Sequence, residues 1–271
     1  MSQHIEICVE TCTLWAEYVS QLLIDKLGCN GTVMEDGAVK GYLPFTKNPD
    51  LSLLQDWPVS TKIIKDEEWA ENWKRYWHPL KVSEKIVICP SWEQYAPENG
   101  EIVISLDPGS AFGTGTHATT RLCIEAIEKI VPQFSGEISM ADIGTGSGIL
   151  SICGVKLGIK SATGVDNDAS VIPVAIENAQ INSVDGDCEF FTGSACSIKG
   201  KYEIVTANIL AEVIIEIVEE LKNLLKPNGT MILSGIIEKK LADVENALNQ
   251  AGLKTREVLT EQGWVAVIAG F

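Results

Sequence analysis

Two glycine-rich segments hold most of the residues whose types and spacing could do chemistry. The first, residues 107–120, contains three glycines, four threonines and a histidine, and the second reads Asp142-Ile-Gly-Thr-Gly-Ser-Gly148. Glycines let the backbone turn tightly and approach a ligand closely. Asp166 stands 22 residues after Gly144, where a carboxylate can accept hydrogen bonds from both hydroxyls of a ribose. Together they predict a pocket for one elongated ligand that carries a nucleoside.

The glycine spacing narrows the class of ligand. A dinucleotide-binding turn has its third glycine three residues after the second, but that position is Ile149 here and the third glycine is Gly148. The segment 107–120 also contains no Lys or Arg that could bind a phosphate. A G-x-G-x-G turn, which includes Gly146, suits a cofactor without a pyrophosphate, such as S-adenosylmethionine. A structural turn without a ligand remains the alternative.

Three further side chains are candidates for this pocket. Asn208 follows a predicted strand, where its amide could orient an amine or hold the methionine end of the cofactor, and it is our candidate catalytic residue. No proline or aromatic residue follows it, which argues against a nucleobase substrate. Phe112 could pack on the ligand or simply in the core. His117 could act as a general base, but we favour a hydrogen bond that fixes the loop or a lid contact over the cofactor.

The elements that must position these residues alternate strand and helix. Apolar runs predict strands at 138–143, 162–165, 189–192, 204–207 and 230–234, and helices at 146–157, 171–181, 210–225 and 239–251. This order is typical of a doubly wound α/β sheet. The last two strand-like runs, 253–259 and 264–269, are joined by only four residues. Because a helical crossover does not fit there, they predict an antiparallel hairpin at the end of a seven-stranded methyltransferase-like sheet.

The first 65 residues predict a separate small domain. Strands at 5–9, 31–34, 38–43 and 59–64, with helices starting after Thr11 or Thr13 and at 51–57, give the β-α-β-β-α-β order of a ferredoxin-like sandwich. Trp69, Trp73 and Trp77 then recur every four residues and predict one stripe of a connecting helix. The stripe could pack against a domain or dock a partner. We expect a small domain at 1–65, a linker helix at 66–80 and a large domain at 81–271.

Composition restricts the partners. A net charge of −16 disfavours direct contact with nucleic acid and favours a basic partner protein, although it could serve solubility alone. The eight cysteines form no C-x-x-C pair and none lies at zinc-ligand spacing, so we expect reduced thiols and no metal. We find no signal peptide and no apolar run long enough to span a membrane, and we expect a cytoplasmic protein.

Five segments together resemble one family, the ribosomal protein L-eleven methyltransferases (PrmA type). They are 107–120, Glu71-Asn-Trp-Lys-Arg-Tyr-Trp77, Pro90-Ser-Trp-Glu93, Gly146-Ser-Gly-Ile-Leu150 and Ala207-Asn-Ile-Leu-Ala211. The resemblance implies that the small domain grips the basic protein of the ribosomal large-subunit stalk base. It also implies methyl transfer from S-adenosylmethionine to lysine ε-amines and an N-terminal α-amine.

The same resemblance places the cofactor contacts on Thr120, Gly144, Asp166 and Asn208. Ala118, Thr145 and Pro173 depart from the usual pattern of the family, but none of them is a carried-over contact. We expect a monomer. The alternatives are a methyltransferase for small molecules or other proteins, and a non-catalytic protein that binds S-adenosylmethionine.

Overall fold

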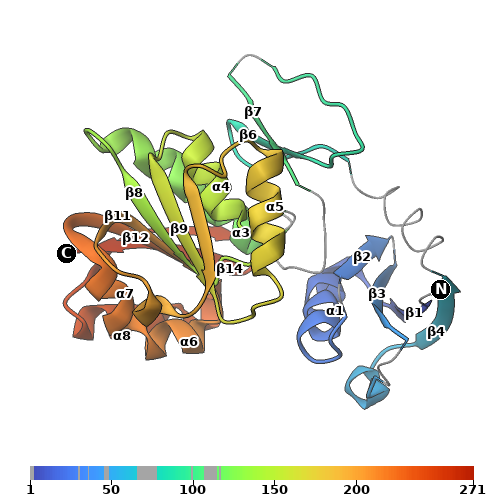
Figure 1. The fold of residues 1–271 in the computed structure, drawn as a ribbon. Helices are drawn as coiled ribbons and strands as arrows, with labels where there is room; N and C mark the ends of the chain where they lie inside the picture. The colour runs from blue at the N-terminus through green and yellow to red at the C-terminus, as the bar shows by residue number, and fades with distance from the viewer. Residues whose placement is uncertain are drawn as a thin grey trace. The chain divides into compact units, whose positions relative to one another are not determined.

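The computed structural model describes residues 3–29, 31–35, 37–45, 49–65, 78–98, 100–106, 115 and 117–271. The chain divides into two compact units, Met1–His78 and Pro79–Phe271 (Figure 1). Phe112, most of the first glycine segment and the helix predicted around Trp69, Trp73 and Trp77 lie outside the described residues.

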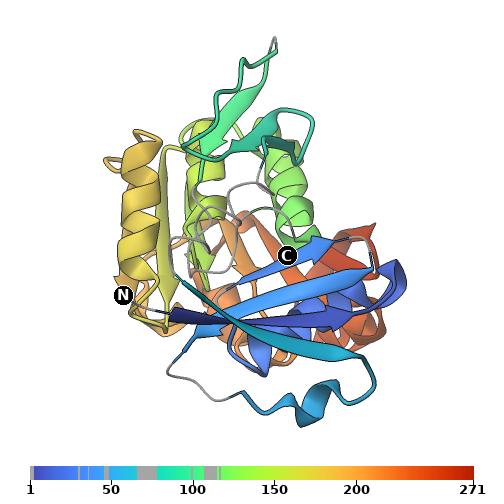
Figure 2. The same ribbon diagram turned by 90° about the vertical axis from the view of Figure 1, so that its right-hand side faces the viewer.

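The small unit is a four-stranded antiparallel sheet with one helix packed on it (Figure 2). Its elements are β1 (Gln3–Glu10), α1 (Thr13–Asp25), β2 (Gly31–Glu35), β3 (Ala38–Pro44), η1 (Leu51–Leu54) and β4 (Val59–Lys65). The strand order β2-β3-β1-β4 is that of a ferredoxin-like sandwich, as predicted. Alternate residues of β1, Ile7 and Val9, face Val19 and Leu23 of α1 in an apolar core.

Two local predictions for the small unit were wrong. The segment 51–57 forms only the short 3-10 helix η1, whose Asp50 side chain accepts a hydrogen bond from the Ser52 backbone. Pro58 disfavours a helical backbone at Trp57, so a helix does not continue to the end of this segment. The N-cap of α1 is Cys12, which makes no side-chain capping bond, rather than Thr11 or Thr13.

The large unit is built on a seven-stranded sheet with the order β10-β9-β8-β11-β12-β14-β13. Its strands are β8 (Ser139–Ile143), β9 (Ser161–Asp166), β10 (Cys188–Thr192), β11 (Tyr202–Asn208), β12 (Leu225–Ile237), β13 (Lys254–Glu261) and β14 (Trp264–Gly270). The first five in the spatial order run parallel, and β14 pairs antiparallel with both of its neighbours. The predicted doubly wound sheet and its antiparallel C-terminal hairpin are therefore confirmed.

Helices cover both faces of this sheet (Figure 1). One face packs on α3 (Ala118–Ile130), α4 (Ile149–Lys156) and α5 (Ile172–Ile181), and the other on α6 (Ala211–Glu216), α7 (Val218–Leu224) and α8 (Leu241–Gln250). Successive side chains of β11 point to opposite faces of the sheet, and each face has its own apolar core. Ile204 packs in the core with the first group of helices and Val205 in the core with the second. The helix predicted at 210–225 is in fact two helices, broken at Ile217, and 239–251 begins with the 3-10 turn η4 (Glu238–Lys240).

A second, three-stranded sheet in the large unit was not predicted. Its strands are β5 (Leu80–Lys81), β6 (Ile86–Cys89) and β7 (Ile102–Ser105), in that order. Ile86, Ile88 and Ile104 are buried in the core that also contains α3 and α4. The sheet therefore fixes the point from which the chain enters the first glycine segment. Among the described residues, no helix is long and apolar enough to cross a membrane.

Candidate active site

The predicted cofactor residues gather at one edge of the central sheet. The strands β9, β8 and β11 are parallel neighbours, with Ile143 paired to both Val165 and Ala207. Gly144, Asp166 and Asn208 each stand one residue beyond these paired positions. Since the carboxyl ends of parallel strands meet at the same edge, the three residues lie together at that edge of the sheet.

The G-x-G-x-G turn needs its glycines. Gly144, Gly146 and Gly148 have φ angles of 72°, 53° and 79°. Residues other than glycine adopt such positive φ angles only with backbone strain. The backbone N–H groups of Gly144 and Thr145 both donate to the carbonyl of Val165, at 2.9 and 3.0 Å. A Cβ atom on Gly144 would lie 2.4 Å from Cγ2 of Ile209. The turn is thus fixed against β9 and against the residue that follows Asn208.

Asp166 is half-buried at the end of β9 and is joined to this turn. Its Oδ2 accepts a hydrogen bond from the Gly146 backbone at 3.0 Å, and its Oδ1 accepts one from the Asp168 backbone at 3.0 Å. Each carboxylate oxygen has a second lone pair, so the side chain can also accept two hydroxyl hydrogen bonds. The neighbour Asp168 does not cap α5, because its Oδ1 accepts from Ser170 while the N-cap of α5 is Val171.

Asn208 and Thr120 are in contact at this edge of the sheet. Thr120 lies fully buried in the first turn of α3, and its Oγ1 accepts a long hydrogen bond of 3.4 Å from Nδ2 of Asn208. The contact joins residues 88 positions apart, one at a helix start and one at the end of β11. It orients the Asn208 amide with its NH2 group toward α3.

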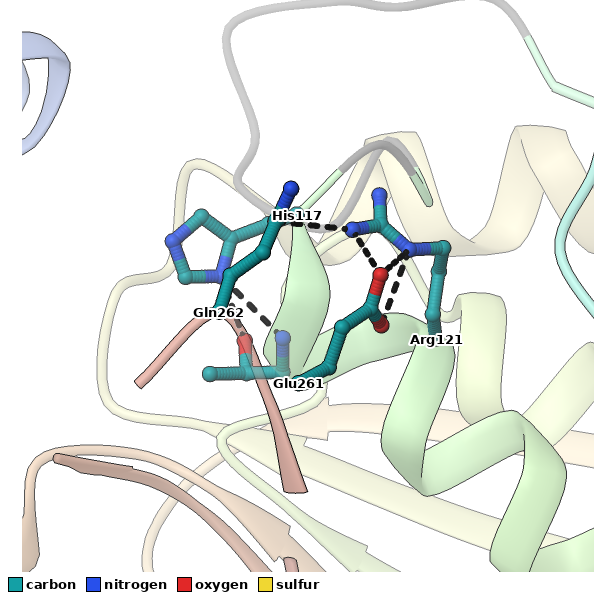
Figure 3. A network of polar contacts seen from close by, with 5 residues as sticks. His117, Arg121, Glu261 and Gln262 are labelled. Carbon is teal, nitrogen blue, oxygen red and sulfur yellow. Dashed lines mark hydrogen bonds and ion pairs between the residues drawn. The ribbon is translucent and has the colours of Figure 1, made fainter. Parts of the chain in front are cut away.

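His117 begins α3 as its N-cap (Figure 3). Its Nδ1 accepts a hydrogen bond from the Thr119 backbone at 3.3 Å and lies 2.8 Å from the Thr119 hydroxyl. The ring also contacts Trp264 edge-to-face, with ring centroids 4.9 Å apart. Nδ1 of His117 is used to cap α3, which fixes the backbone where the loop enters the helix. These contacts match the loop-fixing role that the sequence suggested for His117.

The sequence interpretation assigned no role to the carboxylate of Asp142, which is completely buried at the end of β8. Its Oδ1 accepts from the Thr206 hydroxyl at 2.6 Å, and its Oδ2 accepts from the hydroxyls of Thr145 at 2.7 Å and Ser151 at 3.1 Å. Burial raises the pKa of this carboxyl and the charge of Asp166 adds to the rise, while the three hydroxyl hydrogen bonds oppose it. Asp142 thereby joins β11, the glycine turn and α4. An acidic residue that ends an apolar strand is the signal that could have identified it.

Two buried asparagines, Asn178 on α5 and Asn182 directly after its end, were also missed. Nδ2 of Asn178 donates to the carbonyl of Ser147 in the glycine turn at 2.8 Å. Asn182 exchanges two hydrogen bonds with the backbone of Ser105 at the end of β7, at 2.8 and 2.7 Å. One helix therefore holds both the glycine turn and the strand that leads into the first glycine segment. Their spacing of four residues, across the end of the helix predicted at 171–181, was the available signal.

The arrangement has the features of a site for an adenosyl group and an amine. A half-buried carboxylate for a ribose, a turn with three glycines and an oriented amide lie at adjacent strand ends. The described residues contain no cluster of three or more His, Cys, Asp or Glu side chains that could hold a metal ion. The fold and these groups define a Rossmann-like methyltransferase.

Comparison with known proteins identifies the family. The family model described as "Ribosomal protein L11 methyltransferase (PrmA)" matches residues 43–270, and the chain belongs to this family. It is 41% identical over 271 residues to a ribosomal protein L11 methyltransferase of Alkaliphilus oremlandii, an alignment that covers 93% of this chain and 83% of the relative. A ribosomal protein L11 methyltransferase of Exiguobacterium sp. is 37% identical over 309 residues, with 97% and 98% covered.

A solved structure agrees with this result. The crystal structure of a ribosomal protein L11 methylase from Lactobacillus delbrueckii subsp. bulgaricus superimposes with a TM-score of 0.66 at 33% identity, covering 72% of this chain and 98% of that chain. The resemblance stated from the sequence motifs is confirmed. Family membership also implies S-adenosylmethionine as the methyl donor, as the G-x-G-x-G spacing predicted.

Proposed function

We propose that this chain transfers methyl groups from S-adenosylmethionine to lysine ε-amino groups and the N-terminal α-amino group of ribosomal protein L11. The family match over residues 43–270 is the observation that carries the proposal. The site adds support, because the glycine turn, Asp166 and Asn208 stand together at one sheet edge. A small-molecule acceptor and a non-catalytic role are the alternatives, and neither has a supporting observation in the structure.

In this proposal the cofactor lies along the carboxyl edge of the sheet. Asp166 would accept hydrogen bonds from the ribose hydroxyls, and the backbone of Gly144 and Gly146 would pass beside the adenosyl group. Thr120 and Asn208 would border its methionine end, and Phe112, outside the described residues, stays a predicted contact. When bound, the cofactor supplies a sulfonium methyl group that a neutral amine can attack.

The acceptor amine must lose a proton before it can react. A lysine with a pKa of about 10.4 pays about 4–5 kcal/mol to be neutral at pH 7. A dry crevice disfavours the ammonium form and offsets part of this cost. One N–H of the Asn208 amide donates to Thr120, and the carbonyl oxygen of the same amide would accept a hydrogen bond from the amine and orient it. This role requires no strong base.

The small unit is proposed to recognise the protein substrate, with the boundaries 1–65, 66–80 and 81–271 predicted from the sequence. It carries a cluster of three aromatic rings, Trp15, Tyr18 and Trp57, whose centroids lie 5.9 to 6.5 Å apart. Trp15 and Tyr18 are 49% and 54% exposed. Exposed aromatic clusters of this kind are typical of protein-binding surfaces. The net charge of −16 favours a basic partner over nucleic acid.

The test of this function uses methyl-labelled S-adenosylmethionine and a ribosomal-protein extract. We expect label on ribosomal protein L11. Label found only on small molecules or nucleic acid would contradict the proposal, and tight cofactor binding without any transfer would favour a non-catalytic protein. The monomeric state and the cytoplasmic setting are further parts of the proposal, which sedimentation of the purified chain and cell fractionation would examine.

Asp166→Ala tests the cofactor site within this proposal. We expect its affinity for S-adenosylmethionine, measured by calorimetry, to fall at least about tenfold, because the ribose loses a charged acceptor. Asp168→Ala is the matched control, since Asp168 reaches Asp166 through its backbone N–H, which the substitution keeps. Unchanged affinity in Asp166→Ala would refute the ribose assignment.

A further inference from the structure

The first turn of α3 is tied to the C-terminal hairpin as well as to the central sheet. Thr120, inside this turn, accepts the hydrogen bond from Asn208. The residues on either side of it, His117 and Arg121, are one helical turn apart. Both contact the end of the β13–β14 hairpin, Arg121 through Glu261 (Figure 3) and His117 through Trp264.

Arg121 makes the stronger of these contacts. Its Nε lies 3.0 and 3.1 Å from the two carboxylate oxygens of Glu261, and its Nη2 lies 2.6 Å from Oε1. Nη2 also donates to Oε1 of Gln262 at 3.3 Å. The two side chains of the ion pair are only 20% and 36% exposed, and bidentate pairs of this kind fix orientation as well as distance.

The hairpin turn is suited to hold a neighbouring element in place. Glu261 pairs with Trp264, so the loop contains only Gln262 and Gly263. Their φ angles are 51° and 81°, the pattern of a tight type I′ turn that matches the twist of the two strands. Trp264 then contacts the ring of His117, the N-cap of α3. The two residues that flank this turn, Glu261 and Trp264, thus contact the start of α3 on either side of Thr120.

We propose that Glu261 and Trp264 are positioning residues for the cofactor site. They hold the first turn of α3, and through Thr120 they set the place of the Asn208 amide. Neither residue belongs to the candidate cofactor contacts. The inference rests on the assignment of Thr120 and Asn208 to the cofactor site in the proposed function.

The chain contains a matched control for this proposal. Lys129 and Glu257 form a second ion pair between α3 and β13, with Nζ 2.5 Å from Oε1. The pair joins the same two elements eight residues further along α3, away from the end that carries Thr120. If ion pairs between α3 and β13 only stabilise the fold, the two pairs should be equivalent in every binding measurement.

The test compares Glu261→Ala with Glu257→Ala in the full chain. We expect Glu261→Ala to raise the dissociation constant for S-adenosylmethionine about five- to tenfold by calorimetry, while Glu257→Ala leaves it within about twofold. With ribosomal protein L11 as acceptor, KM for the cofactor should rise in Glu261→Ala and kcat at saturating cofactor should fall, because the displaced Asn208 amide also orients the acceptor amine less well, whereas Glu257→Ala should leave both constants within about twofold. A purely structural role would lower the thermal midpoint of both variants. It would leave Glu261→Ala and Glu257→Ala with the same dissociation constant and the same KM for the cofactor.

The charge-swapped double variant Arg121→Glu with Glu261→Arg keeps the proposal testable if Glu261→Ala folds poorly. We expect it to recover most of the cofactor affinity lost in Glu261→Arg alone. Equal dissociation constants in Glu261→Ala and Glu257→Ala, or no recovery in the double variant, would overturn the proposal. Failure of the proposed function is distinguishable, because it would leave these cofactor affinities as expected and show no methyl transfer to ribosomal protein L11.

Discussion

Among the described residues, Ser20 is the one buried polar side chain of the small unit, whereas the large unit buries eleven, among them Asp142, Thr120 and Asn178. The small unit instead exposes large aromatic side chains, Trp15 and Tyr18, next to an apolar core. A buried polar group is stable only where its partners are fixed, so the large unit holds its groups in one geometry. The contrast indicates that the large unit supplies an ordered site and the small unit a contact surface.

The largest loss of stability is expected when the carboxylate of Asp142, in the ordered large unit, is removed. In Asp142→Ala three buried hydroxyls lose their acceptor and a cavity forms, so we expect the free energy of unfolding to fall by about 3 kcal/mol or more. Denaturant unfolding followed by circular dichroism measures it. Ser151→Ala, which removes one of the three donors, should cost only about 1 kcal/mol. Similar losses in both variants would show that Asp142 is not the centre of the network.

The next effect concerns the glycine turn. Gly144→Ala should lower the free energy of unfolding by about 1–3 kcal/mol, because φ is 72° and the new Cβ would lie 2.4 Å from Ile209. Gly252→Ala is the control, since φ is 78° there and no atom lies within 4 Å of the added Cβ. The difference between the two variants measures the close approach of Gly144 to Ile209. Equal losses would mean that backbone strain alone explains the need for glycine.

The raised pKa of Asp142 predicts a smaller effect that depends on pH. A carboxyl whose pKa is higher in the folded state contributes stability below its unfolded pKa of about 3.9 and loses it as pH rises through the folded pKa. The free energy of unfolding of the wild type, minus that of Asp142→Asn, should therefore decline above about pH 4, by at most about 1.4 kcal/mol per pH unit. Denaturant unfolding at a series of pH values checks this. A difference that grows with pH would show that the hydroxyl hydrogen bonds outweigh burial.

The smallest effect on stability is expected in the small unit. Trp15→Ala and Tyr18→Ala remove half-exposed rings, so the free energy of unfolding should change by less than about 1 kcal/mol. We expect affinity for ribosomal protein L11 to fall about tenfold while affinity for S-adenosylmethionine is unchanged. Phe45→Ala, which removes a ring that is 48% exposed in the same unit, is the control. If Phe45→Ala weakens substrate binding equally, the Trp15–Tyr18–Trp57 cluster is not the contact surface.

Much of the candidate site was predictable because its signals are local. The positive φ angles of Gly144, Gly146 and Gly148 follow from a strand that must turn at once into a helix. Asp166 and Asn208 could be placed because each ends a strand, and parallel strands end at a common edge. The bonds of Asp142, Asn178 and Asn182 could not be predicted, since their partners lie up to 77 residues away and depend on which elements become neighbours.

The sequence by itself determined the ferredoxin-like strand order, the doubly wound sheet and the antiparallel hairpin, because period and loop length are properties of neighbouring residues. It also determined the methyltransferase type of the glycine turn. Only the tertiary structure decided that 210–225 breaks into two helices at Ile217 and that β5, β6 and β7 form a second sheet. It likewise decided that Arg121 meets Glu261, 140 residues away. Such contacts exist only when distant segments pack together, because chain order alone does not bring their side chains within reach.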